Sequence, residues 1–392
     1  MRVLIIGTGL IGTSIGLALR NRAFDGEVWL VDSDLASAQL AADMGAGSLL
    51  AADAGPADLA VLAVPPEAVA VMLADAQARG LARFYTDVAS VKQLPVAQAR
   101  AHGCDMTTYI PGHPLAGREK HGPAAARADL FLGRTWAFCT SPETSRSGSA
   151  CVVALIEACG AVPVNTDPVT HDRWVALVSH APHLVAAAMA ARLEPSGALD
   201  LAGQGLRDVT RIAAGDTGLW TQILTANAAP VAAVLADVAA DLAAAAAALA
   251  DGEPKAVIDL LNRGRAGVAR IPGKHGGVQR SFAAIQVVIR DQPGELARLF
   301  NAAGAAGVNI EDIRIEHSPG LPVGVAELSV PPADVTALLD ALQAGGWPVK
   351  PYLRRTGCGA RGAPPGVRGP GGSHRKNLVA SSSDPAAQAG LA

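Results

Sequence analysis

Apolar and polar positions follow two rhythms in the first two-thirds of the chain. Over residues 1–165, short apolar runs of strand type alternate with segments in which apolar residues recur every three or four positions. The strand-like runs are residues 3–6, 27–31, 59–64, 84–87 and 108–110. Strands that alternate with helices are typical of a parallel sheet covered by helices. The pattern therefore predicts an α/β domain over residues 1–166.

The rhythm is helical throughout residues 168–270. Four apolar residues near the end of this region repeat at helical spacing, which predicts a packed helix. They are Val231, Leu235, Val238 and Leu242. The alanine run at 243–248 is too short to cross a bilayer. We expect an all-helical domain over residues 167–275 that serves substrate binding and dimerisation.

A third pattern follows a glycine-rich segment at 263–277. Four strand-like runs enclose two helical patterns in the order βαββαβ, which is that of a ferredoxin-like unit. The runs are residues 282–290, 308–316, 323–330 and 347–353. We expect this unit to span residues 281–354. Residues 355–392 are rich in Gly, Pro, Ser and Ala, and this composition predicts a disordered tail.

Composition narrows the class of protein. At about 150 residues per domain, 392 residues are enough for more than one domain, and 50% of them are apolar while 17% are charged. A mean hydropathy of +0.27 excludes a largely disordered chain. The net charge of −3 gives no basis for binding nucleic acid or an anionic membrane. Five cysteines without a CxxC pair are typical of a reduced, cytoplasmic protein.

A glycine motif follows the first predicted strand and opens a helix. It reads Gly7-Thr8-Gly9-Leu10-Ile11-Gly12. Gly7 permits a tight turn, Gly9 lets the backbone approach a pyrophosphate, and Gly12 allows close helix–strand packing. The apolar stretch 3–19 also resembles a signal peptide. Its spaced glycines and the lack of an A-x-A cleavage pattern favour the nucleotide-binding interpretation and a cytoplasmic protein.

Asp32 stands 20 residues after Gly12, at the end of the second predicted strand. A carboxylate there accepts hydrogen bonds from ribose hydroxyls and repels a 2′-phosphate, so the cofactor predicted for this Rossmann-type domain is NAD. The alternative is a glycine-rich turn followed by an aspartate that merely caps a helix. Val64 and Pro65 end another strand where the cofactor would pass, although Pro65 and Pro66 are equally consistent with a rigid turn.

Four further motifs carry candidate chemistry. They are Asp87-Val88-Ala89-Ser90-Val91-Lys92, Gly112-His113-Pro114-Leu115-Ala116-Gly117-Arg118-Glu119-Lys120, Ser179-His180-Ala181-Pro182-His183 and Gly205-Leu206-Arg207-Asp208-Val209-Thr210-Arg211-Ile212-Ala213. Together with the glycine motif, they make residues 1–280 resemble the prephenate/arogenate dehydrogenase family of tyrosine biosynthesis. Asp291-Gln292-Pro293-Gly294-Glu295-Leu296 and Val308-Asn309-Ile310 make the third unit resemble an ACT domain, an amino-acid-binding regulatory module.

The resemblance implies an NAD-dependent oxidative decarboxylation. A cyclohexadienol passes a hydride from C4 to NAD and loses its ring carboxylate as CO2. A neutral imidazole can take the C4 hydroxyl proton, and the family pattern gives this role to His113. Ser90 is expected to hydrogen-bond that hydroxyl or His113. The alternatives are a histidine that caps a Pro-rich turn and a serine that caps a helix.

Substrate binding is expected from a second set of residues. Arg211 is the candidate carboxylate clamp, because a guanidinium pairs with a carboxylate in a bidentate manner. His180 and His183 lie three apart, as in a first helical turn around Pro182, and Glu119 and Trp220 complete the predicted pocket. Trp220 is equally consistent with a core residue. No metal site is predicted, because no cysteine or carboxylate completes the histidine pair at helical spacing.

The sequence leaves two candidate substrates. Arg118 stands where many relatives have threonine, so the choice between prephenate and arogenate is not fixed by the sequence. The ACT resemblance implies tyrosine as feedback effector, with Asp291, Pro293, Gly294 and Asn309 at its site.

Two other functions fit the sequence less well. A β-hydroxyacid dehydrogenase would need a helical lysine, and residues 168–254 contain none. A non-catalytic NAD and amino-acid sensor should have lost His113, Ser90 and Arg211. We therefore expect an NAD-dependent prephenate dehydrogenase that acts as a homodimer.

Overall fold

The computed structural model describes residues 1–117, 120–193, 197–271, 282–317 and 322–352. The chain divides into two compact units, Met1–Arg270 and Ile271–Ala392. The predicted tail at 355–392 lies outside the described residues.

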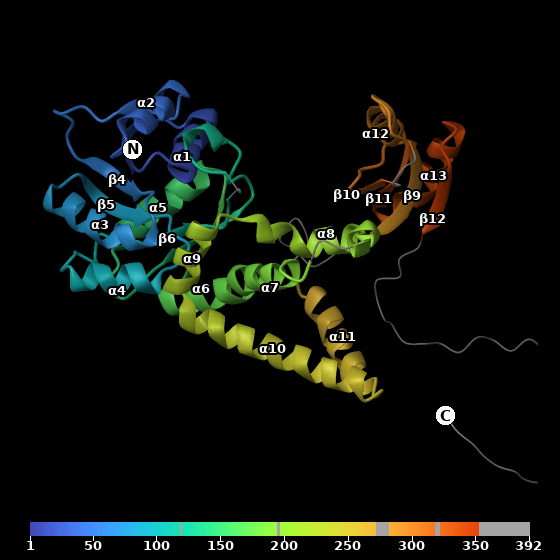
Figure 1. The fold of residues 1–392 in the computed structure, drawn as a ribbon. Coiled ribbons are helices and arrows are strands. Elements are labelled where there is room, and N and C mark those ends of the chain that lie inside the picture. Colours follow the sequence, from blue (N-terminus) through green and yellow to red (C-terminus); the bar gives the residue numbers. More distant parts are fainter. Residues whose placement is uncertain (118–119, 194–196, 272–281, 318–321, 353–392) are drawn as a thin grey trace, which may run out of the picture. The chain divides into compact units, whose positions relative to one another are not determined.

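A five-stranded parallel sheet forms the centre of the first unit (Figure 1). Its strands lie in the order β3-β2-β1-β4-β5, so the chain reverses its direction of travel across the sheet at β1. The bounds are β1 Arg2–Ile6, β2 Glu27–Val31, β3 Ser48–Leu49, β4 Ala57–Leu62 and β5 Ala82–Asp87. This is the doubly wound arrangement predicted from the sequence, and in such sheets ligands bind beyond the carboxyl ends of the strands near the switch point.

Helices cover both faces of this sheet because successive strand residues point to opposite sides. Val3 and Ile5 pack with one apolar cluster, which holds residues of α1 (Leu10–Asn21), α2 (Leu35–Asp43) and α5 (Arg146–Ala158). Leu4 and Ile6 pack with another, which holds residues of α3 (Val69–Ala78) and α4 (Gln93–Ala101). The sheet is thus a buried platform that fixes where its strand ends lie.

A second, three-stranded sheet follows and was not predicted. It consists of β6 (Gly112–Pro114), β7 (Thr135–Cys139) and β8 (Val162–Thr166), with β6 antiparallel and β8 parallel to β7. The strand predicted at 108–110 is wrong, because only Tyr109 pairs there, in an isolated bridge with Tyr85. His113 consequently lies on a short strand of the second sheet rather than beyond the end of a strand of the first.

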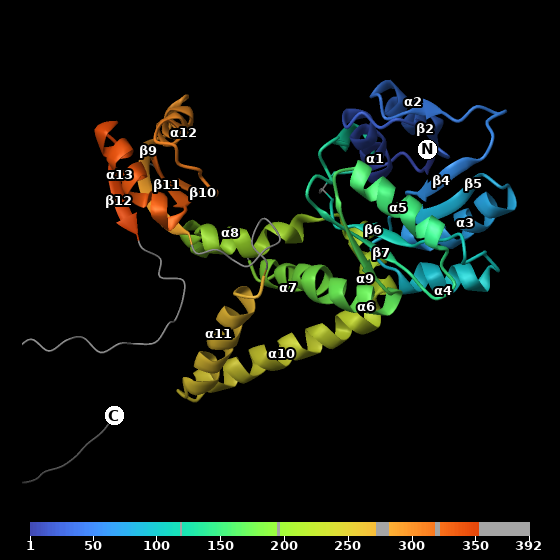
Figure 2. The same ribbon diagram turned by 180° about the vertical axis from the view of Figure 1, so that it is seen from behind.

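The rest of the first unit is helical, as the sequence predicted. Its helices are α6 Pro168–Val175, α7 Ala181–Ala190, α8 Gln204–Thr210, α9 Thr217–Ala226, α10 Ala228–Ala250 and α11 Lys255–Val268. A π-helical turn, Ala176–His180, joins α6 to α7. Both ribbon views show α10 and α11 as an antiparallel pair, and α10 also contacts α7 (Figures 1 and 2).

Helix α10 is more exposed than predicted. It has 23 residues, of which only Val231 is buried, while Leu242 is 58% and Leu249 68% exposed. Within the described residues it is the single helix whose length and composition would suffice to cross a membrane. The alanine run is therefore not a short isolated stretch, and within the described residues the contacts of α10 with α7 and α11 leave most of its apolar side chains exposed.

The second unit has the βαββαβ order predicted for it. Its elements are β9 Ala283–Arg290, α12 Glu295–Ala305, β10 Asp312–His317, β11 Val323–Val330, α13 Val335–Ala344 and β12 Val349–Tyr352. All pairs in the sheet β10-β11-β9-β12 are antiparallel. Strand β11 alternates half-buried and buried residues. Leu299 of α12 and Leu338 of α13 lie in the apolar core of this unit.

Candidate functional site

The glycine turn has the geometry that a nucleotide-binding site requires. Gly7 has a φ of 102°, and a Cβ there would lie 2.4 Å from the Ala63 carbonyl oxygen. A Cβ on Gly12 would lie 1.9 Å from the Gly7 carbonyl oxygen, so α1 can approach β1 only with glycine at this position. Gly9 precedes the first residue of α1, and the space around its Cβ position is open to 4 Å. These residues fit a dinucleotide, with backbone N–H groups directed at its phosphates.

Asp32 follows β2 beside this turn. Its carboxylate accepts hydrogen bonds from the Thr8 backbone N–H at 2.6 Å and the Thr8 hydroxyl at 2.8 Å. Burial alone would raise the pKa of Asp32, but these bonds and one from the Asp34 N–H lower it, so the group is ionised. Asp34, not Asp32, caps α2. The capping alternative for Asp32 is therefore wrong, and its carboxylate remains the candidate ribose ligand.

Val64 and Pro65 lie in the loop after β4. The Val64 side chain would be 3.4 Å from a Cβ on Gly7. Pro65 begins a short 3-10 turn, Pro66–Ala68. Both therefore stand at the same edge of the sheet as the glycine turn.

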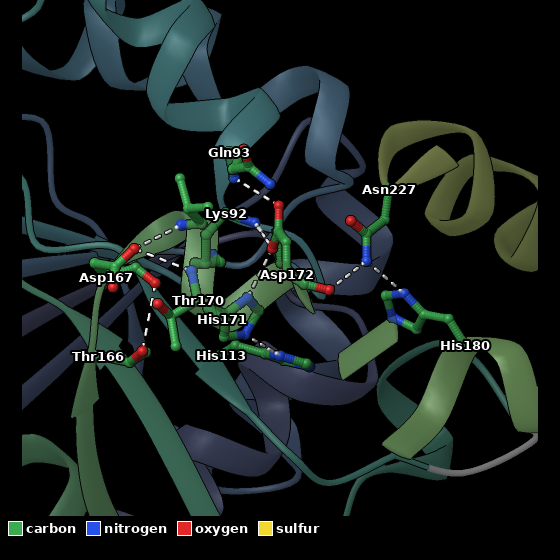
Figure 3. Close-up of polar contacts among 12 residues, drawn as sticks. Lys92, Gln93, His113, Thr166, Asp167, Thr170, His171, Asp172, His180 and Asn227 are labelled. Carbon is green, nitrogen blue, oxygen red and sulfur yellow. Dashed lines mark hydrogen bonds and ion pairs between the residues drawn. The ribbon is translucent and has the colours of Figure 1, made fainter. Parts of the chain in front are cut away.

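His113 begins a row of three polar side chains (Figure 3). Its Nδ1 lies 3.0 Å from Nε2 of His171, and Nδ1 of His171 lies 2.8 Å from Oδ1 of Asp172. His171 and Asp172 belong to α6 and are buried. Burial, then the nearby His171, Lys92 and His180, hold the pKa of His113 well below its usual value. His113 is therefore neutral at pH 7 and able to accept a proton.

Lys92 is fully buried. Its ammonium group pairs with the Asp87 carboxylate and donates a hydrogen bond to the carbonyl oxygen of Gly112 at 2.6 Å. The Tyr109 hydroxyl donates to the other Asp87 oxygen at 2.7 Å. These contacts hold the residue before His113 against the carboxyl end of β5.

The two histidines of α7 and its preceding turn have different partners. His180 is the last residue of the π-helical turn, and its Nδ1 lies 3.0 Å from Nδ2 of Asn227. His183 stacks on Trp220 with ring centroids 3.6 Å apart. Burial lowers the pKa of His180 to about 4 and also lowers that of His183, so both are neutral at pH 7. His180 does not share a first α-helical turn with His183, contrary to the prediction.

Trp220 is half-buried and its position depends on a glycine. A Cβ on Gly215 would lie 2.5 Å from Nε1 of Trp220 and 3.0 Å from Cε1 of His183. Trp220 also meets the His180 ring edge-on, with centroids 6.2 Å apart. The tryptophan is therefore part of the histidine cluster rather than of the apolar core.

Two of the remaining predicted residues, Ser90 and Arg211, lie within the described part of the chain. Ser90 is half-buried in the bend after β5. Arg211 begins a 3-10 turn, Arg211–Ala214, that packs against α7, and it is exposed. Glu119 lies outside the described residues, as does Arg118.

Sequence reasoning missed three polar residues of the site. His171, Asp172 and Asn227 are each at most 2% exposed. The adjacent histidine and aspartate stand on a helix where apolar periodicity gives no reason to single them out. Four of the eight residues of α6 are polar, so polarity offered no signal for His171 and Asp172 either.

The predicted effector residues form a turn and an exposed position in the second unit. Asp291 and Pro293 lie in the turn after β9, and Gly294, with a φ of 90°, precedes α12. Asn309 is exposed and donates to the Glu311 carboxylate at 3.0 Å.

Comparisons with known proteins identify relatives that cover most of the chain. Residues 15–165 match a family model described as the nucleotide-binding domain of prephenate dehydrogenase, and residues 167–263 match its dimerization domain. A probable prephenate dehydrogenase of Streptomyces niveus is 41% identical over 357 residues, which are 88% of this chain and 98% of the relative.

Two solved structures are similar to the first unit. One is a prephenate dehydrogenase of Aquifex aeolicus in complex with hydroxyphenyl propionate and NAD+, with 25% identity and a TM-score of 0.61 over 69% of this chain and 98% of that one. The other is an arogenate dehydrogenase of Synechocystis, with 25% identity and a TM-score of 0.58 over 68% and 99%.

Proposed function

The chain belongs to the prephenate dehydrogenase family, and we propose that it catalyses the NAD-dependent oxidative decarboxylation of prephenate to 4-hydroxyphenylpyruvate in tyrosine biosynthesis. One observation carries the assignment of the chemistry, namely that His113 is half-buried, has a pKa well below its usual value, and is held beside the carboxyl end of β5. The glycine turn at the end of β1 opens toward the same edge of the sheet.

Each part of the reaction has a matching residue. Nε2 of His113 accepts the proton of the C4 hydroxyl, so that the C4–O bond becomes a carbonyl as hydride leaves C4. The glycine turn Gly7–Gly12 would hold NAD, which when bound would supply the hydride acceptor. The bond to the ring carboxylate then breaks, CO2 leaves, and its electron pair completes the aromatic ring. We propose that Ser90, on the loop after β5, hydrogen-bonds the C4 hydroxyl of the substrate or His113.

Substrate recognition is proposed for the cluster on the helical side. His180, His183 and Trp220 form its wall, and Arg211 supplies a cation for a substrate carboxylate. Glu119 is retained as a pocket residue on the resemblance alone.

Arogenate is the second candidate substrate. The similarity to the arogenate dehydrogenase of Synechocystis supports arogenate as a candidate substrate. It differs from prephenate by an amino group in place of the side-chain keto group, so the ring chemistry assigned to His113 is the same.

The second unit is proposed to be an ACT domain that binds tyrosine. Its βαββαβ order and antiparallel sheet support this, as do Asp291, Pro293 and Gly294 at the start of α12 and Asn309 before β10. Because it is a compact unit with its own core, ligand binding there can be separated from catalysis by truncation.

We also propose that the enzyme is a cytoplasmic homodimer. The exposed apolar residues of α10 and an apolar groove between α7 and α10 favour a protein partner. The groove is lined by Leu177, Ala181, Pro182, Val185, Ala186, Val209, Ile212, Val234 and Val238. The matching family model is described as a dimerization domain. Apolar surface buried against a second copy would stabilise the dimer by about 25 cal/mol per Å².

Purified protein should form NADH from NAD and prephenate, and His113→Asn should lose most of this turnover. The asparagine keeps a polar side chain but no imidazole, so kcat should fall by about 100-fold or more while the affinity for NAD stays the same.

Prephenate and arogenate should each be assayed with NAD and with NADP. NADH formation from neither substrate would refute the proposed function.

Arg211→Ala should raise KM for the substrate far more than KM for NAD, because only the carboxylate partner is removed. Arg207→Ala, one helical turn away, is the matched control and should change neither constant by more than about twofold. Equal effects of Arg211→Ala on both KM values would indicate general disruption instead.

A chain truncated before residue 281 should retain dehydrogenase activity and lose inhibition by tyrosine. Initial rates measured with increasing tyrosine test this, with the full chain as control. Persistent inhibition of the truncated enzyme would mean that tyrosine binds at the active site as a product analogue.

Light scattering of the full chain should give about twice the 39.6 kDa mass of one copy. A Val238→Glu variant places a charge in the apolar groove and should shift the mass toward a monomer. Wild-type protein that remains monomeric at micromolar concentration would contradict the proposed dimer.

A further inference from the structure

The carboxylate of Asp172 is a buried acceptor with a complete set of donors. Its Oδ1 accepts from Nδ1 of His171 at 2.8 Å and from the backbone N–H of Lys92 at 2.8 Å. Its Oδ2 accepts from the Gln93 N–H at 2.9 Å. Burial alone would raise the pKa of Asp172, but these hydrogen bonds lower it. Asp172 is therefore ionised and can only accept.

The hydrogen bonds of Asp172 constrain which ring nitrogens of His171 and His113 carry protons. Nδ1 of His171 must carry a proton, because its partner is a carboxylate. The contact of 3.0 Å between Nε2 of His171 and Nδ1 of His113 holds one proton, and placing it on Nδ1 of His113 leaves Nε2 of His171 as the acceptor. Since His113 is itself neutral, its Nε2 carries no proton. That nitrogen is the one a general base needs.

The backbone carbonyl of Asp172 sets a second chain of hydrogen bonds (Figure 3). It accepts from Nδ2 of Asn227 at 2.8 Å, which fixes which end of the amide is the NH2 group. The same Nδ2 lies 3.0 Å from Nδ1 of His180, so this ring nitrogen must accept. Neutral His180 therefore carries its proton on Nε2.

We propose that Asp172 is a positioning residue that sets opposite tautomers in the two site histidines. Through His171 it leaves Nε2 of His113 bare as a proton acceptor. Through Asn227 it makes Nε2 of His180 a hydrogen-bond donor, suited to a carbonyl or carboxylate oxygen of the substrate. This assignment deepens the proposed function and rests on it for the roles of the two nitrogens.

The same row accounts for the charge that forms during the reaction. When Nε2 of His113 takes the hydroxyl proton, the ring becomes an imidazolium whose Nδ1–H still points at His171. His171 is in turn hydrogen-bonded to the Asp172 carboxylate, so positive charge is balanced without moving a second proton. When CO2 leaves, the C4 oxygen becomes a phenolate, and the proton on Nε2 returns to it, so that the product is a phenol and His113 is neutral again. Of the charged and titratable groups facing His113, the cation of Lys92 is already neutralised by Asp87.

Imidazole 15N NMR on histidine-labelled, substrate-free protein tests the tautomers directly. We expect the Nδ1–H form for His113 and His171 and the Nε2–H form for His180. His113→Asn, His171→Gln and His180→Gln each remove one signal and so assign it among the nine histidines. His102→Gln, at an exposed position after α4, is the control and should leave the three assigned signals unchanged. An Nε2–H form for His113 would overturn the proposal, whether or not the protein turns over prephenate.

Two substitutions at 171 test the functional consequence. His171→Phe fills the ring volume but offers no acceptor, so His113 should become a mixture of tautomers and kcat should fall by about 100-fold or more. His171→Gln offers an amide oxygen to His113 and should recover at least about tenfold of that loss. KM for NAD should stay unchanged in both. An unchanged kcat in His171→Phe would refute the role of the row.

Asn227→Leu tests the other arm. It removes the donor to His180, so the His180 signal should change while that of His113 does not. KM for prephenate should rise by about tenfold with little change in kcat. A loss confined to kcat would contradict the donor role of His180. Failure of wild-type turnover would count against the proposed function alone, because the NMR assignments require no substrate.

Discussion

A buried ion pair between Lys92 and Asp87 connects the two sheets of the first unit. The lysine ammonium also binds the Gly112 carbonyl, so the strand that carries His113 is tied to the end of β5. Two charges removed from water are tolerated only when their partners are complete, and loss of one partner from such a pair costs about 3–5 kcal/mol. Tyr109 and the Ala89 N–H supply further donors to Asp87. The position of His113 is therefore fixed by an interaction that cannot be loosened without a large loss of stability.

The helical region is attached to this joint by a second buried carboxylate. Asp172 of α6 accepts the backbone N–H groups of Lys92 and Gln93, at the start of α4. The nucleotide-binding sheet, the strand of His113 and the histidines of the helical region thus meet around one short segment, residues 87–93. A site assembled in this way has its polar groups supported from buried backbone rather than from mobile loops.

The sequence predicted those parts of the molecule that depend on local pattern. Strand and helix periodicity gave the parallel sheet and the βαββαβ unit, and the spacing from Gly12 to Asp32 identified the nucleotide turn. It did not reveal β7 and β8, because these strands have only five residues each and show no regular alternation of apolar and polar positions, and because they are ordered by pairing across the chain. It also did not reveal the burial of Lys92 or the roles of His171, Asp172 and Asn227, because these arise from contacts between residues up to 80 positions apart. The exposure of α10 was missed for the opposite reason, since a pattern of apolar residues does not say which chain covers them.

The π-helical turn at Ala176–His180 has a consequence for the geometry of everything after it. A turn of this kind accommodates one residue more than an α-helical turn, and each residue of an α-helix advances the azimuth by about 100°. Helix α7 is therefore rotated about its axis relative to a continuous extension of α6. His183 and the groove-lining residues Ala181 and Val185 inherit that angular phase together. The extra residue of the π-helical turn therefore orients the side of α7 that carries His183 and its apolar side at the same time.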